Sequence, residues 1–164
     1  MQDIKILYVT SEITPFVQTS SISNTVRLLA ESYTKQKMAI RIFLPRYGVI
    51  NELKNHINSV FRLSFINIPV GKEDISLVVK ASSIKKIKAP VYLIDNEDLF
   101  QRKGIFQDQN GNWYKDNDVR SIFFCKGVLQ ALKEVGWSPD IIHCHGWFAA
   151  FIACLLYTSD AADD

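Results

Sequence analysis

The sequence predicts an α/β protein with a doubly wound parallel sheet and a β-hairpin insertion. Buried-strand patterns at residues 4–9, 39–44, 91–94 and 141–144 alternate with helical patterns, an order typical of parallel strands joined by helical crossovers. The stretch at 60–81 breaks this rhythm, because apolar and polar residues alternate on both sides of a turn. With 164 residues and 48% hydrophobic content, a single globular domain is the default.

The first strand leads into a connection rich in serine and threonine, and then into an amphipathic helix. Apolar residues recur there at helical spacing, namely Ile22, Val26, Leu29 and Tyr33. The second strand, 39–44, is stopped by Pro45. Because strand, helix and strand follow in that order, we expect the two strands to be parallel.

A polar pair, Asp95-Asn96, stands where the strand at 91–94 opens onto a loop. The following segment, 97–115, is long and aromatic, and loops of that length are usually functional or mobile. A second long helix is predicted from Asp116 to Gly136, with acidic residues favourable at its start. Its predicted buried face carries Ile122, Cys125, Leu129 and Leu132.

Charge and composition exclude several classes of partner. The net charge of +2, from 19 basic and 17 acidic residues, provides no large field to attract nucleic acid or an anionic membrane. The basic run at 85–88 is interpreted as a solvated turn. The longest apolar stretch, 146–157, is shorter than the ~20 residues that cross a bilayer. Three cysteines and no signal-like N-terminus favour a cytoplasmic location.

The connection at 15–24 occupies the place where an α/β protein usually binds its ligand. Loops that cradle phosphate use glycines, which let backbone N–H groups approach the anion, and often a lysine. This connection contains neither residue type. Its serines have no adjacent base and no G-x-S-x-G elbow, so serine-hydrolase chemistry is unsupported.

The triplet His143-Cys144-His145 invites a metal interpretation, because imidazole and thiolate are common zinc ligands. In a strand, however, His143 and His145 share one face and Cys144 points to the other, and no second ligand cluster exists. We therefore expect no metal. His145 lies where the last predicted strand gives way to a third helical stretch, so it fits either a ligand contact or a loop histidine bonded to a nearby carbonyl.

Other polar and aromatic residues are equally open to two interpretations. Asp116-Asn117 could contact a ligand or cap a helix. Aromatic planes suit the apolar faces of sugar rings, but most aromatic residues belong to cores. The aromatic residues concerned are Trp113, Tyr114, Trp137 and Trp147. The residue chemistry alone indicates a cytosolic α/β domain with a site built from loops.

Taken in order, these segments resemble the N-terminal half of bacterial glycogen synthases and plant starch synthases. The resemblance runs from about Lys5 to Phe151. It is carried by residues 5–12 (KILYVTSE) with Pro15-Phe16, 44–48 (LPRYG), 91–96 (VYLIDN), Leu99-Phe100, Gly104-Ile105, Tyr114, Asp116-Asn117, Arg120, Trp137, 139–143 (PDIIH) and 145–147 (HGW). Order and spacing together make the set specific.

The resemblance implies that residues 1–153 are a Rossmann-like domain, the acceptor-side half of a retaining GT-B glucosyltransferase. Such enzymes transfer glucose from a nucleotide sugar, usually ADP-glucose in bacteria, to the non-reducing 4-hydroxyl of an α-1,4-glucan. No metal or other cofactor is implied. A second Rossmann-like domain, absent from this chain, supplies most nucleotide contacts, so the fragment is expected to be inactive alone. The implied site consists of His145 as catalytic residue and Gln18, Thr19, Asp95, Asn96, Asp116 and Asn117 as substrate contacts.

The chain departs from the family at its most functional positions. The family loop Lys-Thr-Gly-Gly-Leu-Gly-Asp reads QTSSISN at residues 18–24, and His-Asp-Trp-His-Thr-Ala reads HGWFAA at 145–150. Replacing lysine by Gln18 removes a charge-assisted contact worth about 1.5–3 kcal/mol, so we expect weaker or rearranged donor binding. Residues 154–164 turn polar and acidic and are predicted to be a tail foreign to the family.

These departures keep two alternatives open. One is a non-catalytic glucan-binding or regulatory homologue that has lost the donor-loop residues. The other is a nucleotide-sugar enzyme with a different acceptor.

Overall fold

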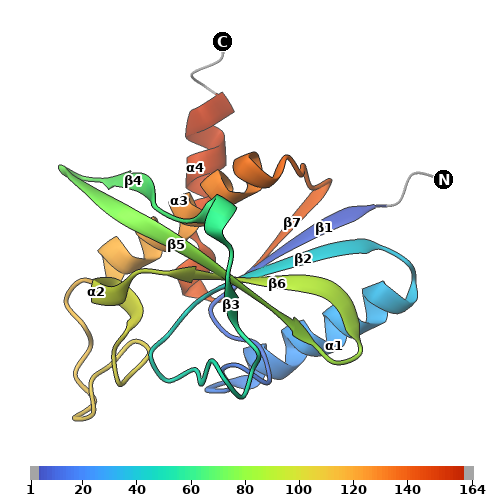
Figure 1. The fold of residues 1–164 in the computed structure, drawn as a ribbon, viewed down its shortest axis with the longest axis horizontal. Helices are drawn as coiled ribbons and strands as arrows, with labels where there is room; N and C mark the ends of the chain where they lie inside the picture. The colour runs from blue at the N-terminus through green and yellow to red at the C-terminus, as the bar shows by residue number, and fades with distance from the viewer. Residues whose placement is uncertain (1–3, 161–164) are drawn as a thin grey trace.

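The computed structural model describes residues 4–160, which form a mixed seven-stranded sheet flanked by helices (Figure 1). The elements in chain order are β1 (Lys5–Thr10), α1 (Ser21–Lys35), β2 (Ala39–Pro45), β3 (Asn58–Ser59), the 3-10 turn η1 (Phe61–Leu63), β4 (Ile66–Val70), β5 (Glu73–Ile84), β6 (Ile87–Asp95), α2 (Glu97–Phe100), α3 (Asn117–Val135), β7 (Ile141–His145), the 3-10 turn η2 (Trp147–Ala149) and α4 (Phe151–Asp160). Residues 161–164 of the predicted tail lie outside the described part.

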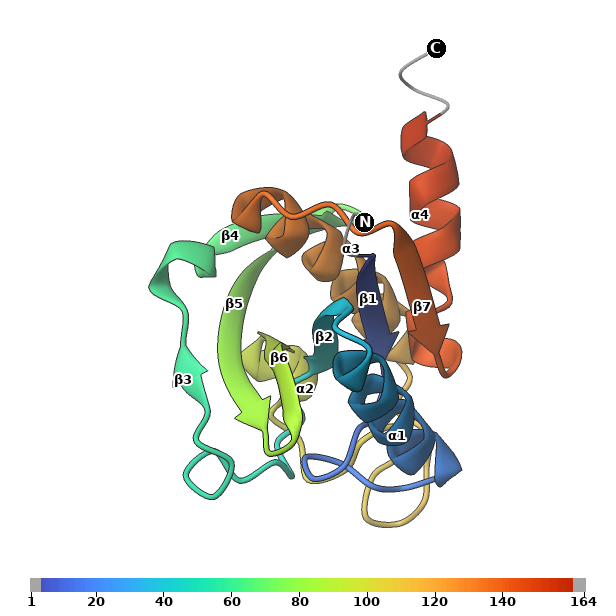
Figure 2. The ribbon, with the colours of Figure 1, turned by 90° about the vertical axis from the view of Figure 1, so that its right-hand side faces the viewer.

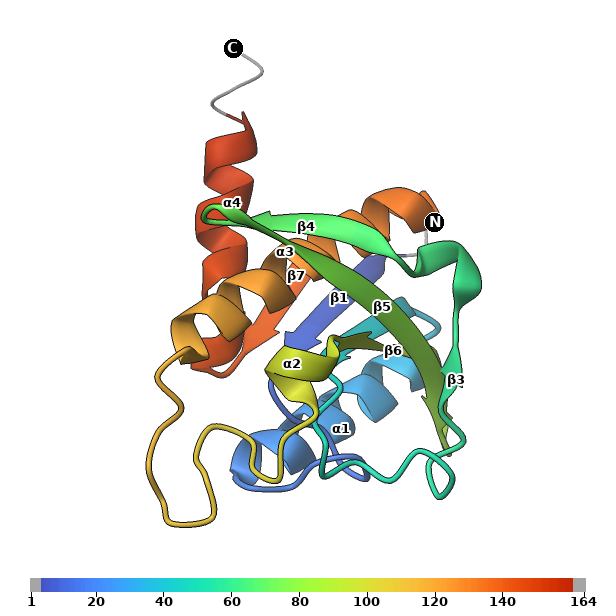
Figure 3. The same cartoon turned by 60° about the vertical axis from the view of Figure 1, so that its left-hand side comes forward.

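The central strands are parallel and lie in the order β6-β2-β1-β7. The chain leaves β1 through α1 to reach β2 and later β6, and then returns through α3 to β7 on the other side of β1. Figures 2 and 3 show α1 on one face of the sheet, with α3 and α4 on the other. The predicted doubly wound parallel sheet is therefore confirmed.

The predicted hairpin is present, but its first strand is shorter than expected. β4 pairs with β5 in antiparallel fashion, whereas residues 61–63 form η1. The alternation at 60–65 was misleading because Phe61 and Phe65 are 83% and 75% exposed, and Phe65 has a positive φ of 64°. β5 also pairs antiparallel with β6, and the turn between them is Lys85-Lys86, part of the predicted basic turn.

The second long helix has the predicted bounds, whereas α1 begins at Ser21, inside the segment 15–24 that was expected to be a connection. Ser20 caps α1 by accepting a hydrogen bond from the Ile22 N–H at 3.1 Å, and Val26 is buried beneath the helix. Gly136 ends α3 in the left-handed conformation, with φ 63° and ψ 40°. No helix among residues 4–160 is both long and apolar enough to cross a membrane.

Candidate functional site

The topology places the ligand crevice at the carboxyl ends of β1 and β7. In open α/β sheets, ligands bind where two neighbouring strands send their connections to opposite faces, and here β1 leads to α1 while β7 leads through η2 to α4. Thr10 stands opposite His145 in the register, and the Ser11 N–H donates to the His145 carbonyl at 3.3 Å. The loop after β1 and the turn after β7 therefore meet at this edge.

Glu12 organises the loop that precedes α1. Its Oε2 accepts hydrogen bonds from the Thr19 N–H at 2.7 Å, the Thr19 hydroxyl at 3.0 Å and the Ser20 N–H at 3.0 Å. Its Oε1 accepts from the Ser20 hydroxyl. Burial alone raises the pKa of Glu12, but the bonds from Ser20 and Thr19 outweigh burial and hold the pKa below its usual value. The carboxylate is thus ionised at neutral pH, and Gln18 is left exposed beside it.

His145 lies in a row of rings on the α1 side of the sheet. Its ring centre is 4.2 Å from that of His143 and 5.6 Å from that of Tyr8, so the two histidines share a face as the strand alternation predicts. Burial, together with the neighbouring His143, lowers the pKa of His145 to about 4. Its Nε2 is buried without a hydrogen-bond partner in the described residues. His145 is therefore neutral at physiological pH, with one ring nitrogen unsatisfied.

The turn after His145 depends on glycine. Gly146 has φ 79° and ψ 157°, a conformation that is essentially restricted to glycine. A Cβ at this position would lie 2.6 Å from Ser11 Oγ. The aspartate that the family pattern places after the first histidine would therefore strain this backbone and require the Ser11 hydroxyl to move.

Three aromatic side chains, Phe106, Trp113 and Trp147, form what we call the aromatic wall. Phe106 and Trp113 are stacked at 6.3 Å and 11°, and Trp147 lies 5.1 Å from Phe106 and 6.1 Å from Trp113. Trp113 and Trp147 are 58% and 45% exposed. Phe106, Trp113 and Thr19 line a cavity of about 450 Å³. Phe106 and Trp113 of the wall therefore share a cavity with the loop that Glu12 holds.

Asp116 and Asn117 support the segment that carries the wall. Both Asp116 oxygens accept from the Arg102 guanidinium, at 2.8 and 2.5 Å. Asn117 Nδ2 donates to the Phe106 carbonyl at 2.9 Å, and its Oδ1 accepts from Arg120 Nη1 at 2.5 Å. Arg102 holds the pKa of Asp116 below its ordinary value. Asp116 occupies the N-cap position of α3, but its side chain makes no capping bond.

Asp95 and Asn96 are engaged on the other side of this edge. Asp95 pairs with Lys80 at 3.0 Å and accepts from Gln101 at 3.1 Å. Asn96 caps α2 by accepting from the Leu99 N–H at 3.1 Å and donates to the Ser76 carbonyl at 2.9 Å. The structure therefore gives both residues partners within the protein, in β5 and around α2. Their assignment as substrate contacts stays a prediction.

Comparison with known proteins decides the family. Residues 5–164 match the family described as the starch synthase catalytic domain. The chain belongs to this family.

Glycogen synthases from Chlorobium and Chlorobaculum species are similar along nearly the whole chain. The Chlorobium luteolum protein is 39% identical over 96% of this chain and 32% of its own length. The Chlorobaculum tepidum protein is 37% identical over 99% of this chain and 34% of its own length. This chain therefore spans about a third of the curated relatives that it matches.

A solved structure confirms the fold. The catalytic domain of starch synthase IV from Arabidopsis thaliana, described as bound to ADP and acarbose, superposes with a TM-score of 0.81 at 20% identity. The match covers 95% of this chain and 30% of that one. An α/β fold with a parallel-dominated sheet, expected from the sequence, is thus shared with this starch synthase domain.

Several residues of this starch synthase domain were missed by sequence reasoning. Glu12 lies two residues beyond the end of the buried strand β1, and this position and its place in the family-like run 5–12 are the signals that pointed to it. Arg102 and Phe106 lie in the long aromatic segment and carry no pattern of their own. Among residues 4–160, no three His, Cys, Asp or Glu side chains gather closely enough to hold a metal ion.

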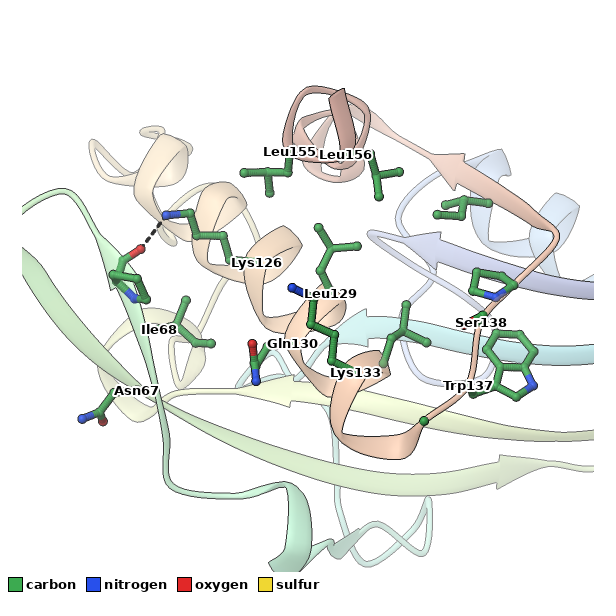
Figure 4. Close-up of a pocket in the computed structure, with 15 residues that line it drawn as sticks. Asn67, Ile68, Lys126, Leu129, Gln130, Lys133, Trp137, Ser138, Leu155 and Leu156 are labelled. Carbon is green, nitrogen blue, oxygen red and sulfur yellow. Dashed lines mark hydrogen bonds between the residues drawn. The ribbon is translucent and has the colours of Figure 1, made fainter. Parts of the chain in front are cut away.

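A larger hollow of about 610 Å³ lies away from the crevice, between β4, α3 and α4 (Figure 4). Its lining is mostly aliphatic, including Ile68, Leu129 and Leu155, and contains no carboxylate. Lys126 spans one end by donating to the Pro69 carbonyl at 2.7 Å. Trp137 also lines this hollow, so it is not a candidate for the aromatic wall. We therefore assign the candidate site of this starch synthase domain to the crevice.

Proposed function

We propose that this chain is the N-terminal, acceptor-side half of a glucosyltransferase of the glycogen and starch synthase type. The proposed reaction moves glucose from ADP-glucose to the non-reducing end of an α-1,4-glucan, with retained configuration. The relatives named glycogen synthase and the starch synthase structure bound to ADP and acarbose support this proposal. Because the chain spans a third of its relatives, the activity belongs to the whole protein, including a second domain outside this chain.

The aromatic wall beside the Glu12-held loop is the observation that carries the proposal. Sugar rings present apolar C–H faces that stack on aromatic planes, and Trp113 and Trp147 offer exposed planes of this kind. The cavity of about 450 Å³ lies within the usual size range of small-molecule sites. Asp116 and Asn117 contribute by holding the wall in place.

His145 and Gln18 offer neutral hydrogen-bonding groups at the same edge. Because its pKa is lowered to about 4, His145 acts as a hydrogen-bonding imidazole rather than as a cation. Gln18 supplies an uncharged amide in the loop where the family pattern has lysine. A cytoplasmic location is part of the proposal and is consistent with the three free thiols of Cys125, Cys144 and Cys154.

A non-catalytic glucan-binding protein is the second candidate, and a specific observation favours it. The N–H and hydroxyl donors of Thr19 and Ser20 already bond to Glu12, so the loop has lost donors that could serve a nucleotide sugar. The wall would still bind glucan in such a protein.

Incorporation of radiolabelled glucose into glycogen by the whole protein separates the two candidates. We expect incorporation from ADP-glucose, dependent on added glycogen. Binding of glycogen without incorporation, from either ADP-glucose or UDP-glucose, would establish the non-catalytic protein instead. Incorporation into an acceptor other than α-glucan would identify an enzyme with a different acceptor.

A further inference from the structure

The carboxylate of Glu12 fills the space at which an anion would contact the loop before α1. Glu12 is 4% exposed, and both of its oxygens point at the backbone and side chains of residues 19–20. Three of its bonds have donor–acceptor distances of 2.7–3.0 Å, within the range of well-formed hydrogen bonds. The arrangement is the one that a bound phosphate would adopt at such a loop, with the protein's own carboxylate in its place.

The bonds to Glu12 use every donor of the two loop residues. Thr19 donates both its N–H and its hydroxyl to Oε2, and Ser20 donates its N–H to Oε2 and its hydroxyl to Oε1. The Ser20 oxygen in turn accepts from the Ile22 N–H at 3.1 Å, which ties the loop to the first turn of α1. Neither Thr19 nor Ser20 therefore has an N–H or O–H left for a ligand.

We propose that Glu12 is the built-in anion of this loop: it positions Thr19 and Ser20 and excludes phosphate from their N–H groups. Glu12 is thus a residue that sets ligand specificity through the loop. The loop presents Gln18 and the Thr19 side chain to the neutral part of a ligand. That the excluded group is a phosphate of the nucleotide sugar rests on the proposed function. The exclusion of phosphate from the loop rests on the hydrogen bonds to Glu12 alone.

The electrostatics of the loop point in the same direction. Glu12 is held ionised, because the hydrogen bonds from Ser20 and Thr19 outweigh the effect of burial on its pKa. Residues 15–24 contain no lysine or arginine to offset this charge. The cation that lines the adjoining cavity is Lys103, which belongs to the segment after α2. A phosphate entering the loop would therefore meet a fixed negative charge and no free donor on Thr19 or Ser20.

Phosphate titration of the isotopically labelled chain, followed by amide NMR, tests the proposal. In the wild-type chain, we expect the Thr19 and Ser20 amide signals to stay unchanged when inorganic phosphate or pyrophosphate is added. In Glu12→Gln, which keeps the size of the side chain, these amides should respond, with phosphate bound at least about tenfold more tightly. Glu31→Gln is the matched control, because it removes one carboxylate on α1 that pairs with Arg27 instead.

Two results would overturn the proposal. One is a phosphate-induced shift of the Thr19 and Ser20 amides in the wild-type chain, which decides the matter even if Glu12→Gln does not fold. The other is a folded Glu12→Gln chain that binds phosphate no better than the wild type. Because the readout is phosphate binding by the chain itself, a whole protein that fails to transfer glucose would leave the result intact.

Discussion

Gly146 and Ser11 approach each other so closely that a side chain in the turn after β7 would strain the backbone and require the Ser11 hydroxyl to move. The site that a Cβ of Gly146 would occupy lies 2.6 Å from Ser11 Oγ, and the backbone there has φ 79° and ψ 157°. Glycine, which stands here in place of the family's aspartate, thus fits both the local backbone conformation and the position of Ser11.

Gly146→Ala tests this relationship. We expect it to lower the free energy of unfolding by about 2–3 kcal/mol, because backbone strain and the contact with Ser11 add. Gly136→Ala is the control, since Gly136 lies in the left-handed helical region with no atom near its Cβ position, and we expect a cost of about 1 kcal/mol. Urea unfolding of both variants gives the comparison. Equal costs would show that the Ser11 contact is irrelevant.

Much of the fold follows from local patterns. The spacing of Val26 and its neighbours predicted α1, and the buried runs predicted the parallel strands, because hydrophobic periodicity is a local property. The boundary of β4 was misplaced because alternation does not show which face is buried. Phe61 and Phe65 are apolar yet exposed, and whether such residues are buried depends on how the whole sheet packs.

The sequence predicted where the candidate site lies in the sheet, but it did not predict which side chains bond to one another there. The end of β1 and the position of His145 follow from the strand order. The bonds of Glu12 to Thr19, and of Asp116 to Arg102, join residues seven and fourteen positions apart across loops without regular structure. No periodicity encodes such pairs, so residues expected to contact substrate turned out to have partners within the protein.

Asp116 is expected to act on the site through Arg102. The pair is partly exposed, so we expect Asp116→Asn and Arg102→Ala each to cost only about 0.5–1 kcal/mol of stability. Both substitutions should weaken glycogen binding by similar factors. The double variant should bind glycogen no more weakly than either single variant, because each substitution breaks the same Arg102–Asp116 ion pair. Affinity electrophoresis in gels containing glycogen measures this. A loss confined to Asp116→Asn would instead indicate that this carboxylate touches the sugar.

Glu12 makes the chain sensitive to acid. Its pKa is lowered on folding, so its contribution to stability is present above the ordinary carboxyl value of 4.5 and is lost as pH falls through the lower folded value. Tyr47 is the titratable side chain whose charge couples to Glu12, and its own pKa is raised, so it stays neutral throughout this window. We expect Glu12→Gln to cost about 1–3 kcal/mol at neutral pH.

The difference between wild type and Glu12→Gln should shrink as the pH falls below 4.5. Urea unfolding at several pH values measures it, with Glu31→Gln as a control near zero effect. A difference that stays constant with pH would show that the carboxylate charge is not involved.

His145 should remain neutral through the physiological range. Its pKa falls from 6.5 in the unfolded chain to about 4 in the fold, so the unfolded state binds more protons in this interval and stability rises with pH across it. NMR titration of the imidazole should show no protonation near 6.5. In the whole protein, His145→Ala should reduce glucosyl transfer at least about tenfold with the fold retained. Unchanged turnover would remove His145 from the site.

Binding of glycogen by this chain tests the central assignment, a saccharide site on the aromatic wall, most directly. In affinity electrophoresis, we expect the wild-type chain to be retarded by glycogen and Trp113→Ala to bind about tenfold more weakly, because one stacking plane is lost. Phe61→Ala, which removes a more exposed aromatic ring in η1, outside the wall, should be retarded like the wild type. A wild-type chain that is not retarded, or a Trp113→Ala chain retarded as strongly as the wild type, would contradict the assignment.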